Sequence, residues 1–500
     1  MSTAAAPREG ARFERDEEGR LEHLDVLIVG AGLSGIGAAH HLQEKLPHKS
    51  YAILEARDTI GGTWDLFRYP GIRSDSDMHT LGYRFRPWTE AKAIADGPSI
   101  LEYVNDTARE GGIDRHIRFH HKVTAMSWSS EDARWTVTAE RTDTGEAVRL
   151  TASFVFSCTG YYRYDEGYTP ELPGTERFNG RIVHPQHWPE DLDYSGKRVV
   201  VIGSGATAVT LVPAMAKDAA HVTMLQRSPS YVVTLPGEDP AHSALKRFLP
   251  ARFAYPIVRW KNVTMATLFY RASRRWPKFM SRVIRRGVER QLPPGFDVDK
   301  HFKPSYDPWD QRICLVPDGD LFVALGDGSA SVVTAHIDTF TETGIRLRSG
   351  EELEADVVVT ATGLNLLPLG GLDFTVDGRK VELPETMAYK AMMLSDVPNY
   401  AFAIGYTNAS WTLKADLTSE YVCRLLRHMD DRGLRVAVPH RDPSVEEEPL
   451  LDFTSGYVLR SLDKFPKQGT RAPWKVHQNY PKDVVSLRHG PVTDGMRFAA

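Results

Sequence analysis

The sequence predicts an α/β protein with two Rossmann-like dinucleotide-binding domains, one inserted in the other, and a helical insertion. Three observations predict this fold class. An apolar strand beginning at Asp25 runs into a glycine loop and a helix, and the same order recurs from Arg198. Each of these units is followed by a second apolar strand, as a βαβ unit requires. Two further apolar strands, at 154–160 and 356–363, end in Thr-Gly.

The two Thr-Gly strands predict how the domains are divided. We expect each strand to close one nucleotide fold and to pass the chain to the other fold. The first domain then takes residues 25–160 and 364–500, and the second takes residues 161–363. Residues 1–24 combine small and charged residues without an apolar segment, which predicts a flexible N-terminal extension rather than a signal peptide.

The first glycine loop reads Gly30-Ala-Gly-Leu-Ser-Gly35. Gly30, Gly32 and Gly35 allow a tight turn, a backbone close to a pyrophosphate, and close packing of helix on strand. Ser34 lies in the same loop. Glu55, at the end of the next strand, is placed to bind a ribose 2′-hydroxyl. Because strand, loop, helix and acid all agree, we predict a dinucleotide site here.

The second glycine loop differs from the first at the end of its second strand. There the chain offers Gln226 and Arg227 in place of an acid. A guanidinium binds a 2′-phosphate that a carboxylate would repel, so NADPH is favoured over NADH. An ordinary solvated surface arginine is the alternative interpretation of Arg227. The predicted cofactor residues of this unit are Gly203, Ser204, Gly205, Ala206, Thr207, Ala208, Val209, Gln226 and Arg227.

Composition excludes several classes of protein. The 500 residues carry a net charge of -4, which gives no general argument for nucleic acid or anionic membrane. Only three cysteines occur, far apart, which excludes a disulfide framework, a cysteine-type zinc site and a dithiol flavin reductase. A run of about 18 apolar residues, as a spanning helix needs, is missing from the sequence. We therefore expect a cytoplasmic protein.

The stretch from about 240 to 303 predicts a basic helical insertion in the second domain. Its core, residues 251–300, holds twelve Lys or Arg against three acids, with tryptophan, phenylalanine and tyrosine interleaved. Three interpretations remain open. It forms a solvated helical face, a surface for peripheral contact with anionic lipid, or, least favoured because no recognised module accompanies the charge, a nucleic-acid surface.

Two longer motifs narrow the function. One is the stretch Gly61 to Asp75, which contains Gly-Gly-Thr-Trp-Asp. The other has the form F-x-G-x-x-x-H-x-x-x-W-P, with Phe178, Gly180, His184, Trp188 and Pro189 at its fixed positions. Together they closely resemble the signatures of the Baeyer–Villiger monooxygenases, the carbonyl-oxygenating branch of the class B flavoprotein monooxygenases. The Trp-Pro ending distinguishes this branch from ordinary flavin-containing monooxygenases.

The resemblance runs over nearly the whole chain after the N-terminal extension. Stretches at 308–320, 387–393 and 405–416 resemble a mycobacterial, thioamide-activating branch of the same family. The resemblance implies FAD in the first domain and NADPH in the second. It also implies reaction of O₂ at flavin C4a, giving a peroxyflavin that converts ketones to esters or lactones and oxygenates sulfides and thioamides.

Site residues follow from the same resemblance. Arg312 matches the family's active-site arginine, whose fixed positive charge would stabilise the anionic adduct, and Asp75 matches the acid beside it. The alternative is that Arg312 only pairs with Asp310 or Asp307. Gln311 stands where many members have a lysine that recognises the 2′-phosphate. The further residues implied at the flavin are Thr63, Trp64, Asp65, Leu66, Arg73, Ser74 and Val123.

Two other groups have weaker assignments. His184 and His187 could suggest a metal, but Pro185 disfavours a regular helix and no carboxylates or cysteines cluster nearby, so we predict no metal site. The resemblance makes His184 a residue that couples domain movement. The segment 408–413 is expected near the flavin or substrate, with Met392, Met393 and Trp411 either lining the cavity or forming plain core.

Two functions compete with the main prediction. One is an S- or N-oxygenating flavin monooxygenase with little ketone activity, against which the Trp-Pro ending speaks. The other is a redox sensor that binds FAD and NADP(H) and oxygenates nothing. Arg312, Asp75 and both glycine loops argue against the sensor. The identity of the product distinguishes all three.

Overall fold

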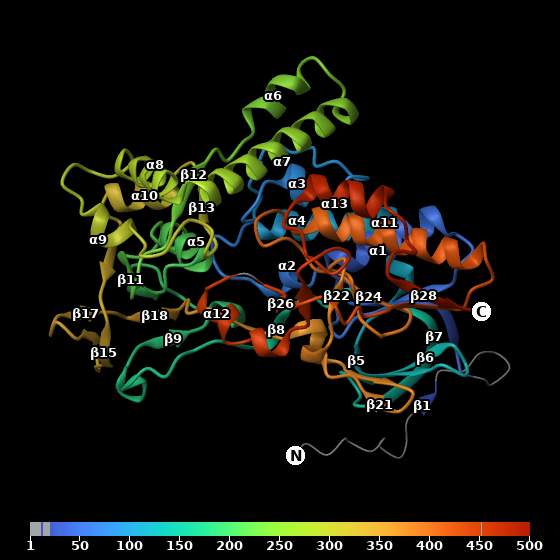
Figure 1. Ribbon diagram of the computed structural model, residues 1–500. Coiled ribbons are helices and arrows are strands. Elements are labelled where there is room, and N and C mark those ends of the chain that lie inside the picture. The colour runs from blue at the N-terminus through green and yellow to red at the C-terminus, as the bar shows by residue number, and fades with distance from the viewer. Residues whose placement is uncertain (1–11, 14–20, 452) are drawn as a thin grey trace.

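The computed structural model describes residues 12–13, 21–451 and 453–500 (Figure 1). Most of the predicted N-terminal extension lies outside the described residues. Within it, Arg12–Phe13 (β1) pairs with strand β7, and strand β2 already begins at His23. None of the helices in these ranges is long and apolar enough to cross a bilayer.

The first body of the protein is a ten-stranded mixed sheet, with strand order β21-β20-β5-β6-β7-β2-β3-β4 and with β1 and β24 also pairing with β7. Strands β7, β2, β3 and β4 are parallel to one another, and β5 and β6 form antiparallel pairs. Strand β2 is buried on both faces: Val26 and Ile28 pack in one cluster with residues of α1, and Leu27 and Val29 pack in another with residues of strands and loops. The strands are β2 (His23–Val29), β3 (Tyr51–Leu54), β4 (Ile117–Arg118), β5 (His121–Ser129), β6 (Arg134–Arg141), β7 (Ala147–Ser157), β20 (Asp373–Val376), β21 (Arg379–Lys380) and β24 (Tyr400–Phe402).

Helices of this body come from both ends of the chain. Helix α1 (Leu33–Lys45) begins within the first glycine loop and packs against α11 (Trp411–Asp430), most of whose residues are buried. The remaining helices here are α2 (Thr63–Leu66), α3 (Met78–Leu81), α4 (Gly97–Glu110), α12 (Gly456–Leu459) and α13 (Tyr480–Asp483). The C-terminal part of the chain thus completes the core that the N-terminal part begins.

The second body is a five-stranded parallel sheet with order β14-β11-β10-β18-β9. Figure 1 shows it on the left of the molecule, apart from the larger sheet on the right. Its strands are β9 (Arg181–Val183), β10 (Arg198–Ile202), β11 (His221–Gln226), β14 (Ala330–Thr334) and β18 (Val357–Thr360). Helices α5 (Ala206–Met215) and α10 (Asp320–Gly326) pack beside it. This gives the predicted α/β class with two nucleotide-type sheets.

The chain crosses between the two bodies at a short antiparallel ribbon. Strand β8 (Tyr162–Gly167) leaves the larger sheet and pairs with β19 (Leu364–Leu366), which returns from the smaller one. Strands β12 (Val232–Leu235) and β13 (Cys314–Pro317) form a second small pair. A separate three-stranded meander consists of β15 (Ile337–Phe340), β16 (Gly344–Leu347) and β17 (Glu352–Glu354).

The basic stretch forms helices, as predicted. They are α6 (Pro240–Lys246), α7 (Ala251–Arg275), α8 (Pro277–Glu289) and α9 (Val298–Phe302). Helix α7 contacts α3 of the larger body, whereas α8 contacts β12 of the smaller one. In Figure 1, α6 and α7 lie along the upper edge of the molecule.

Candidate active site between the two sheets

A cavity of about 1250 Å³ lies between the two bodies and receives both glycine loops. Several of its lining residues directly follow parallel strands of the two sheets. This is where α/β sheets bind ligands, because the carboxyl ends of the strands open onto one crevice. The lining residues that follow strands β2, β3, β7, β10, β11 and β18 are Gly30, Glu55, Cys158, Gly203, Arg227 and Ala361.

The first glycine loop is shaped for close backbone contact. Gly30 has a φ of +102°, and a Cβ there would lie 2.7 Å from the carbonyl oxygen of Cys158. A Cβ on Gly35 would lie 1.9 Å from the carbonyl oxygen of Gly30, so Gly35 serves helix packing and does not line the cavity. Gly32 and Ser34 do line it.

Glu55 lines the cavity but is already held by the backbone. One carboxylate oxygen accepts a hydrogen bond from the amide of Ala31 at 2.7 Å, and the other accepts one from the amide of Arg57 at 3.0 Å. Burial raises the pKa of Glu55, and these amides act in the opposite direction. The carboxylate is therefore fixed in place with capacity to accept a further hydrogen bond.

In the second glycine loop, one position requires glycine, and the other has empty space around it. Gly203 has a φ of +147°, and a Cβ there would lie 2.3 Å from the carbonyl oxygen of Ala361. A Cβ on Gly205 would meet no atom within 4 Å. The space over Gly205 is the kind of cradle into which a phosphate group can approach the backbone.

Some residues around this loop line the cavity, and others lie in the protein core. Ser204, Ala206, Thr207 and the exposed Arg227 line the cavity. Gln226 is buried, and its amide donates to the carbonyl of His301 at 2.8 Å and to the hydroxyl of Thr334 at 2.9 Å. Also in the core, away from the cavity, are Ala208 and Val209.

Arg312 and Asp75 meet in the cavity. The guanidinium Nη2 of Arg312 lies 2.7 Å from Oδ2 of Asp75, and the two side chains are 30% and 45% exposed. Desolvation opposes the charge of Arg312, but Asp75 and the nearby tyrosines together outweigh it, so the pKa of this arginine is raised. Asp310, the alternative partner considered from the sequence, pairs instead with Arg274 at 2.6 Å.

Three tyrosines beside this pair escaped the sequence analysis. Tyr161, Tyr162 and Tyr457 line the same cavity as Arg312 and help to raise its pKa. Burial raises the pKa of Tyr161 to about 12. A usable signal existed for two of them, since they directly follow the Thr-Gly pair just beyond the end of β7. Lining residues His336, Tyr164 and Arg460 were likewise missed.

The segment 63–75 supplies much of the wall on the side of the first glycine loop. Thr63, Trp64, Leu66, Arg73 and Ser74 line the cavity, as does Val123. The hydroxyl of Ser74 is buried and has no hydrogen-bond partner in the described part of the chain. Such an orphaned group fits a site whose ligand completes the hydrogen bond.

Two predicted residues of this segment have protein partners. Arg73 forms an ion pair with Asp320, at the start of α10 in the other body. Asp65 does not line the cavity, and its carboxylate lies between Arg57 and Arg68.

Trp411 lines the cavity, whereas Met392 and Met393 are fully buried outside it. The indole nitrogen of Trp411 donates to the hydroxyl of Ser34 at 2.7 Å, and its ring stacks on Tyr161 with centroids 5.3 Å apart. The start of α11 is thereby tied to the first glycine loop.

The residues of the second long motif lie outside the cavity. These are Phe178, Gly180, His184, Trp188 and Pro189. His184 packs on the crossing ribbon: Nδ1 accepts from the amide of Gln186, and Nε2 donates to the carbonyl of Gly363 at 3.3 Å. Burial lowers the pKa of His184. Within the described residues, no three His, Cys, Asp or Glu side chains gather as metal ligands.

Comparison with known proteins agrees with this geometry. Residues 91–269 match the model of the flavin-binding monooxygenase-like family, and residues 28–96 match that of the NAD(P)-binding Rossmann-like domain. The chain is 60% identical to an FAD-containing monooxygenase of Mycobacterium tuberculosis, EthA, over 96% of this chain and 98% of that one.

Solved structures share the fold. A steroid monooxygenase bound to NADP has a TM-score of 0.75 at 22% identity, covering 95% of this chain and 99% of that one. An open cyclohexanone monooxygenase has a TM-score of 0.74 at 21% identity, covering 96% and 100%. The predicted fold class is confirmed, as is the resemblance that the motifs carried.

Proposed function

Since the chain belongs to the FAD-containing monooxygenases, and is thus an oxidoreductase that uses FAD and NADPH, we propose that it converts ketones to esters or lactones. Oxygenation of sulfides and thioamides is the second activity that we propose. The substrates are then small ketones, sulfides or thioamides together with O₂. The names of the solved neighbours, which include a cyclohexanone monooxygenase, support the ketone reaction.

The observation that carries the proposal is the pairing of Arg312 with Asp75 inside a cavity that both glycine loops enter. A redox sensor needs two nucleotide sites but no fixed cation where they meet. An oxygenase that attacks carbonyl carbon does need one, because negative charge develops on oxygen as the tetrahedral adduct forms. Arg312 can supply that positive charge without titrating.

The residues present fit FAD on the side of the larger sheet. The glycine loop at Gly30, the fixed carboxylate of Glu55 and the unpartnered hydroxyl of Ser74 offer contacts for pyrophosphate, ribose and a further polar group. Bound FAD, once reduced by NADPH, would supply the chemistry that activates O₂. Trp64 and Trp411 would enclose the reacting ring system in an apolar wall.

NADPH would bind on the side of the smaller sheet. Its pyrophosphate would lie over Gly205, where a side chain would meet nothing, and its 2′-phosphate would be held by the exposed Arg227. His336 lies two residues beyond the end of β14, Arg227 lies one residue beyond the end of β11, and both line the cavity. Histidine therefore adds a second donor to the proposed phosphate site, where Gln311 replaces the lysine of many relatives.

The proposal extends to domain bounds and location. We assign residues 25–160 and 364–500 to the FAD domain and 161–363 to the NADP domain, with the helical insertion at about 240–303. The membership of the strands in two sheets supports this division. All three cysteines are buried free thiols, which suits a reducing cytoplasm.

Product analysis tests the proposed reaction. The purified enzyme, loaded with FAD, is incubated in air with NADPH and a panel of ketones and sulfides, and products are measured by mass spectrometry beside NADPH consumption. We expect an ester or lactone heavier than its ketone by one oxygen. Sulfoxide without ester would favour a heteroatom oxygenase instead, and peroxide alone would refute oxygen transfer for the compounds tested.

A further inference from the structure

The outer face of helix α7 exposes four large apolar side chains and one threonine in a line along the helix. Phe253, Ile257 and Leu268 are 53%, 51% and 59% exposed. Together with Trp260 and the exposed Thr264 they follow the spacing i, i+4, i+7, i+11, i+15, which places them along one side of a helix. We call these five residues the outer stripe. Soluble proteins rarely leave such a line of large apolar groups in water.

Helix α8 and the residue before it also expose apolar side chains. Trp276, between α7 and α8, is 58% exposed, and Phe279 and Val283 on α8 are 56% and 43% exposed. The opposite face of α8, with Met280, Ile284 and Val288, is buried. Each helix therefore has one apolar face that is buried against the protein. Each also has further apolar side chains that the described residues leave uncovered.

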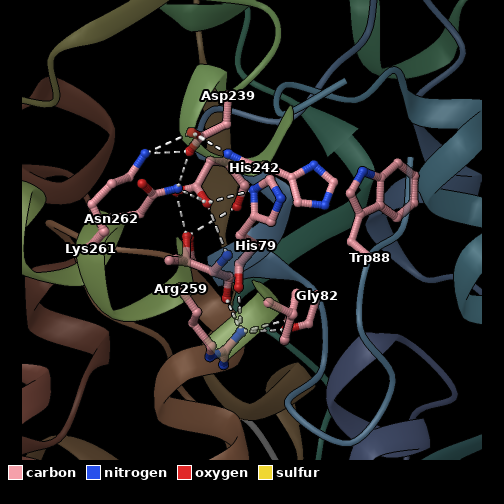
Figure 2. A network of polar contacts seen from close by, with 12 residues as sticks. His79, Gly82, Trp88, Asp239, His242, Arg259, Lys261 and Asn262 are labelled. Carbon is pink, nitrogen blue, oxygen red and sulfur yellow. Dashed lines mark hydrogen bonds and ion pairs between the residues drawn. The ribbon is translucent and has the colours of Figure 1, made fainter. Parts of the chain in front are cut away.

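The inner face of α7 is firmly anchored (Figure 2). The buried guanidinium of Arg259 donates to the carbonyls of His79 at 2.7 Å and Gly82 at 2.8 Å. The ammonium of Lys261 lies 2.7 Å from both carboxylate oxygens of Asp239. The amide of Asn262 donates to Asp239 and to Asp77. Because these contacts fix the helix, the exposure of its outer stripe is a property of the folded protein.

Exposed positive charges surround the outer stripe. Residues 246–290 contain a single acid, Glu289. The exposed basic residues of this stretch that form no ion pair with an acid of the described chain are Lys246, Arg247, Arg252, Arg271, Arg275, Lys278, Arg282, Arg286 and Arg290. Arg271 and Arg275 extend the line of the outer stripe by i+18 and i+22. A net negative protein thus concentrates cations on one apolar face.

We propose that the outer face of α7 and α8 docks on a bilayer surface rich in anionic lipid. Apolar groups enter the boundary between headgroups and acyl chains, while the flanking arginines and lysines meet the lipid phosphates. This goes beyond the proposed function and does not depend on it. A nucleic acid would match the charge but would leave Ile257, Leu268 and Val283 in water. A second copy meeting this face symmetrically would bring two cationic clusters together.

Vesicle binding tests the proposal with the full-length protein. Sedimentation with vesicles of phosphatidylcholine alone is compared with vesicles containing phosphatidylglycerol, with Trp260 and Trp276 fluorescence as a second signal. We expect binding only to the anionic vesicles. The triple variant Arg271→Gln/Lys278→Gln/Arg286→Gln should bind roughly a hundredfold more weakly, at about fivefold per charge. The control Arg348→Gln/Arg379→Gln/Arg497→Gln removes three exposed charges elsewhere and should bind normally.

An apolar variant separates docking from simple charge attraction. Phe253→Ser/Ile257→Ser/Leu268→Ser keeps every charge and should also lose vesicle binding, while its melting temperature and its NADPH oxidation in vesicle-free buffer stay near the parent values. The proposal would be overturned if the parent, the Arg271/Lys278/Arg286 variant and the apolar variant all bound the vesicles equally. It would also be overturned by binding to duplex DNA that survives the apolar variant, or by a parent dimer that the apolar variant dissociates without any vesicle binding by either form.

Discussion

The guanidinium of Arg312 contacts the carboxylate of Asp75 at 2.7 Å, across the gap between the two bodies of the protein. Two residues earlier, Arg73 pairs with Asp320 of the smaller body. The segment 73–75 is therefore fastened at two points to the unit that holds the second glycine loop. Arg312 takes its orientation from a residue of the opposite body, so its placement depends on how the bodies meet.

Replacing Arg312 by alanine should separate cofactor reduction from oxygen transfer. We expect NADPH-driven flavin reduction to stay within about twofold of the parent rate, because the glycine loops are untouched. Ester formation should fall by about a hundredfold or more, since a fixed charge facing a developing oxyanion is lost. Stopped-flow absorbance and product analysis measure the two rates. Arg348→Ala is the control, and Asp75→Asn should give an intermediate loss. Ester formation at the parent rate would disprove the assigned role.

Arg227 should decide the choice of coenzyme. In Arg227→Ala we expect the KM for NADPH to rise roughly 10- to 100-fold, because a charge-assisted phosphate contact is removed. The KM for NADH, which has no 2′-phosphate, should hardly change. Steady-state kinetics with both coenzymes measures the difference. An equal rise for NADH and NADPH would show that Arg227 acts only on the structure.

Gln226, the residue before Arg227, should affect the stability of the protein rather than the binding of the coenzyme. Gln226→Leu leaves the carbonyl of His301 without its donor and removes one of two partners of the Thr334 hydroxyl, so it should cost about 1–3 kcal/mol of stability. The KM of the surviving folded enzyme for NADPH should stay unchanged, because the side chain does not line the cavity. Thermal unfolding and kinetics on the same preparation test both statements.

The two glycines of the second loop should respond differently to alanine. Gly203→Ala forces a φ of +147° on a residue with a side chain and a clash with Ala361, so we expect poor folding or a melting temperature lower by more than about 5 °C. Gly205→Ala meets no protein atom and has a φ of -82°, so its melting temperature should be unchanged. Its KM for NADPH should rise roughly tenfold to a hundredfold as the phosphate is displaced. Normal NADPH kinetics in Gly205→Ala would remove the pyrophosphate from this position.

His79 should make stability depend on pH. The ring is fully buried beside His242, with centroids 4.6 Å apart, and neither nitrogen forms a hydrogen bond with the described residues. Burial lowers the pKa of His79 below its usual 6.5, Asp77 and Asp239 oppose this shift, and His242 and Lys261 support it. Below pH 6.5 the unfolded chain therefore binds a proton that the folded protein resists, and stability falls as pH falls.

In His79→Leu, we expect the melting temperature to decline less between pH 7 and pH 5 than in the parent. His48→Leu, at an exposed position, serves as the control and should keep the slope of the parent. Differential scanning calorimetry across this range provides the measurement. An unchanged slope in His79→Leu would assign the acid sensitivity to other buried histidines.

What the sequence could predict was mainly local. Glycine loops, the strands before them and Arg227 form contiguous patterns, and their places at the cavity follow from the geometry of parallel strands. Neighbouring residues were harder to separate: Gln226, the last residue of β11, is buried, whereas Arg227, the next residue of the chain, is exposed. Ala208 and Val209 likewise belong to the buried side of α5.

Contacts between residues far apart in the chain could hardly be predicted from the sequence. Tyr457 and Arg460 reach the cavity from a short helix near the C-terminus, and nothing in their local sequence marks them. The approach of Asp75 to Arg312 was expected only through the family resemblance, because no spacing rule joins two loops of different bodies. The separation of Trp411 from Met392 and Met393 depends on packing, which one unaligned sequence does not determine.

The antiparallel ribbon of β8 and β19 has a consequence for engineering and for evolution. Leu364 pairs with Gly167 and Leu366 with Tyr162, so the two crossings are bonded to one another rather than running separately. Exchange of the smaller body between homologues therefore needs two matched breakpoints in one recombination event. A chimera that imports only one crossing would join mismatched ribbon strands, whereas grafts that include both 162–167 and 364–366 would keep the ribbon intact.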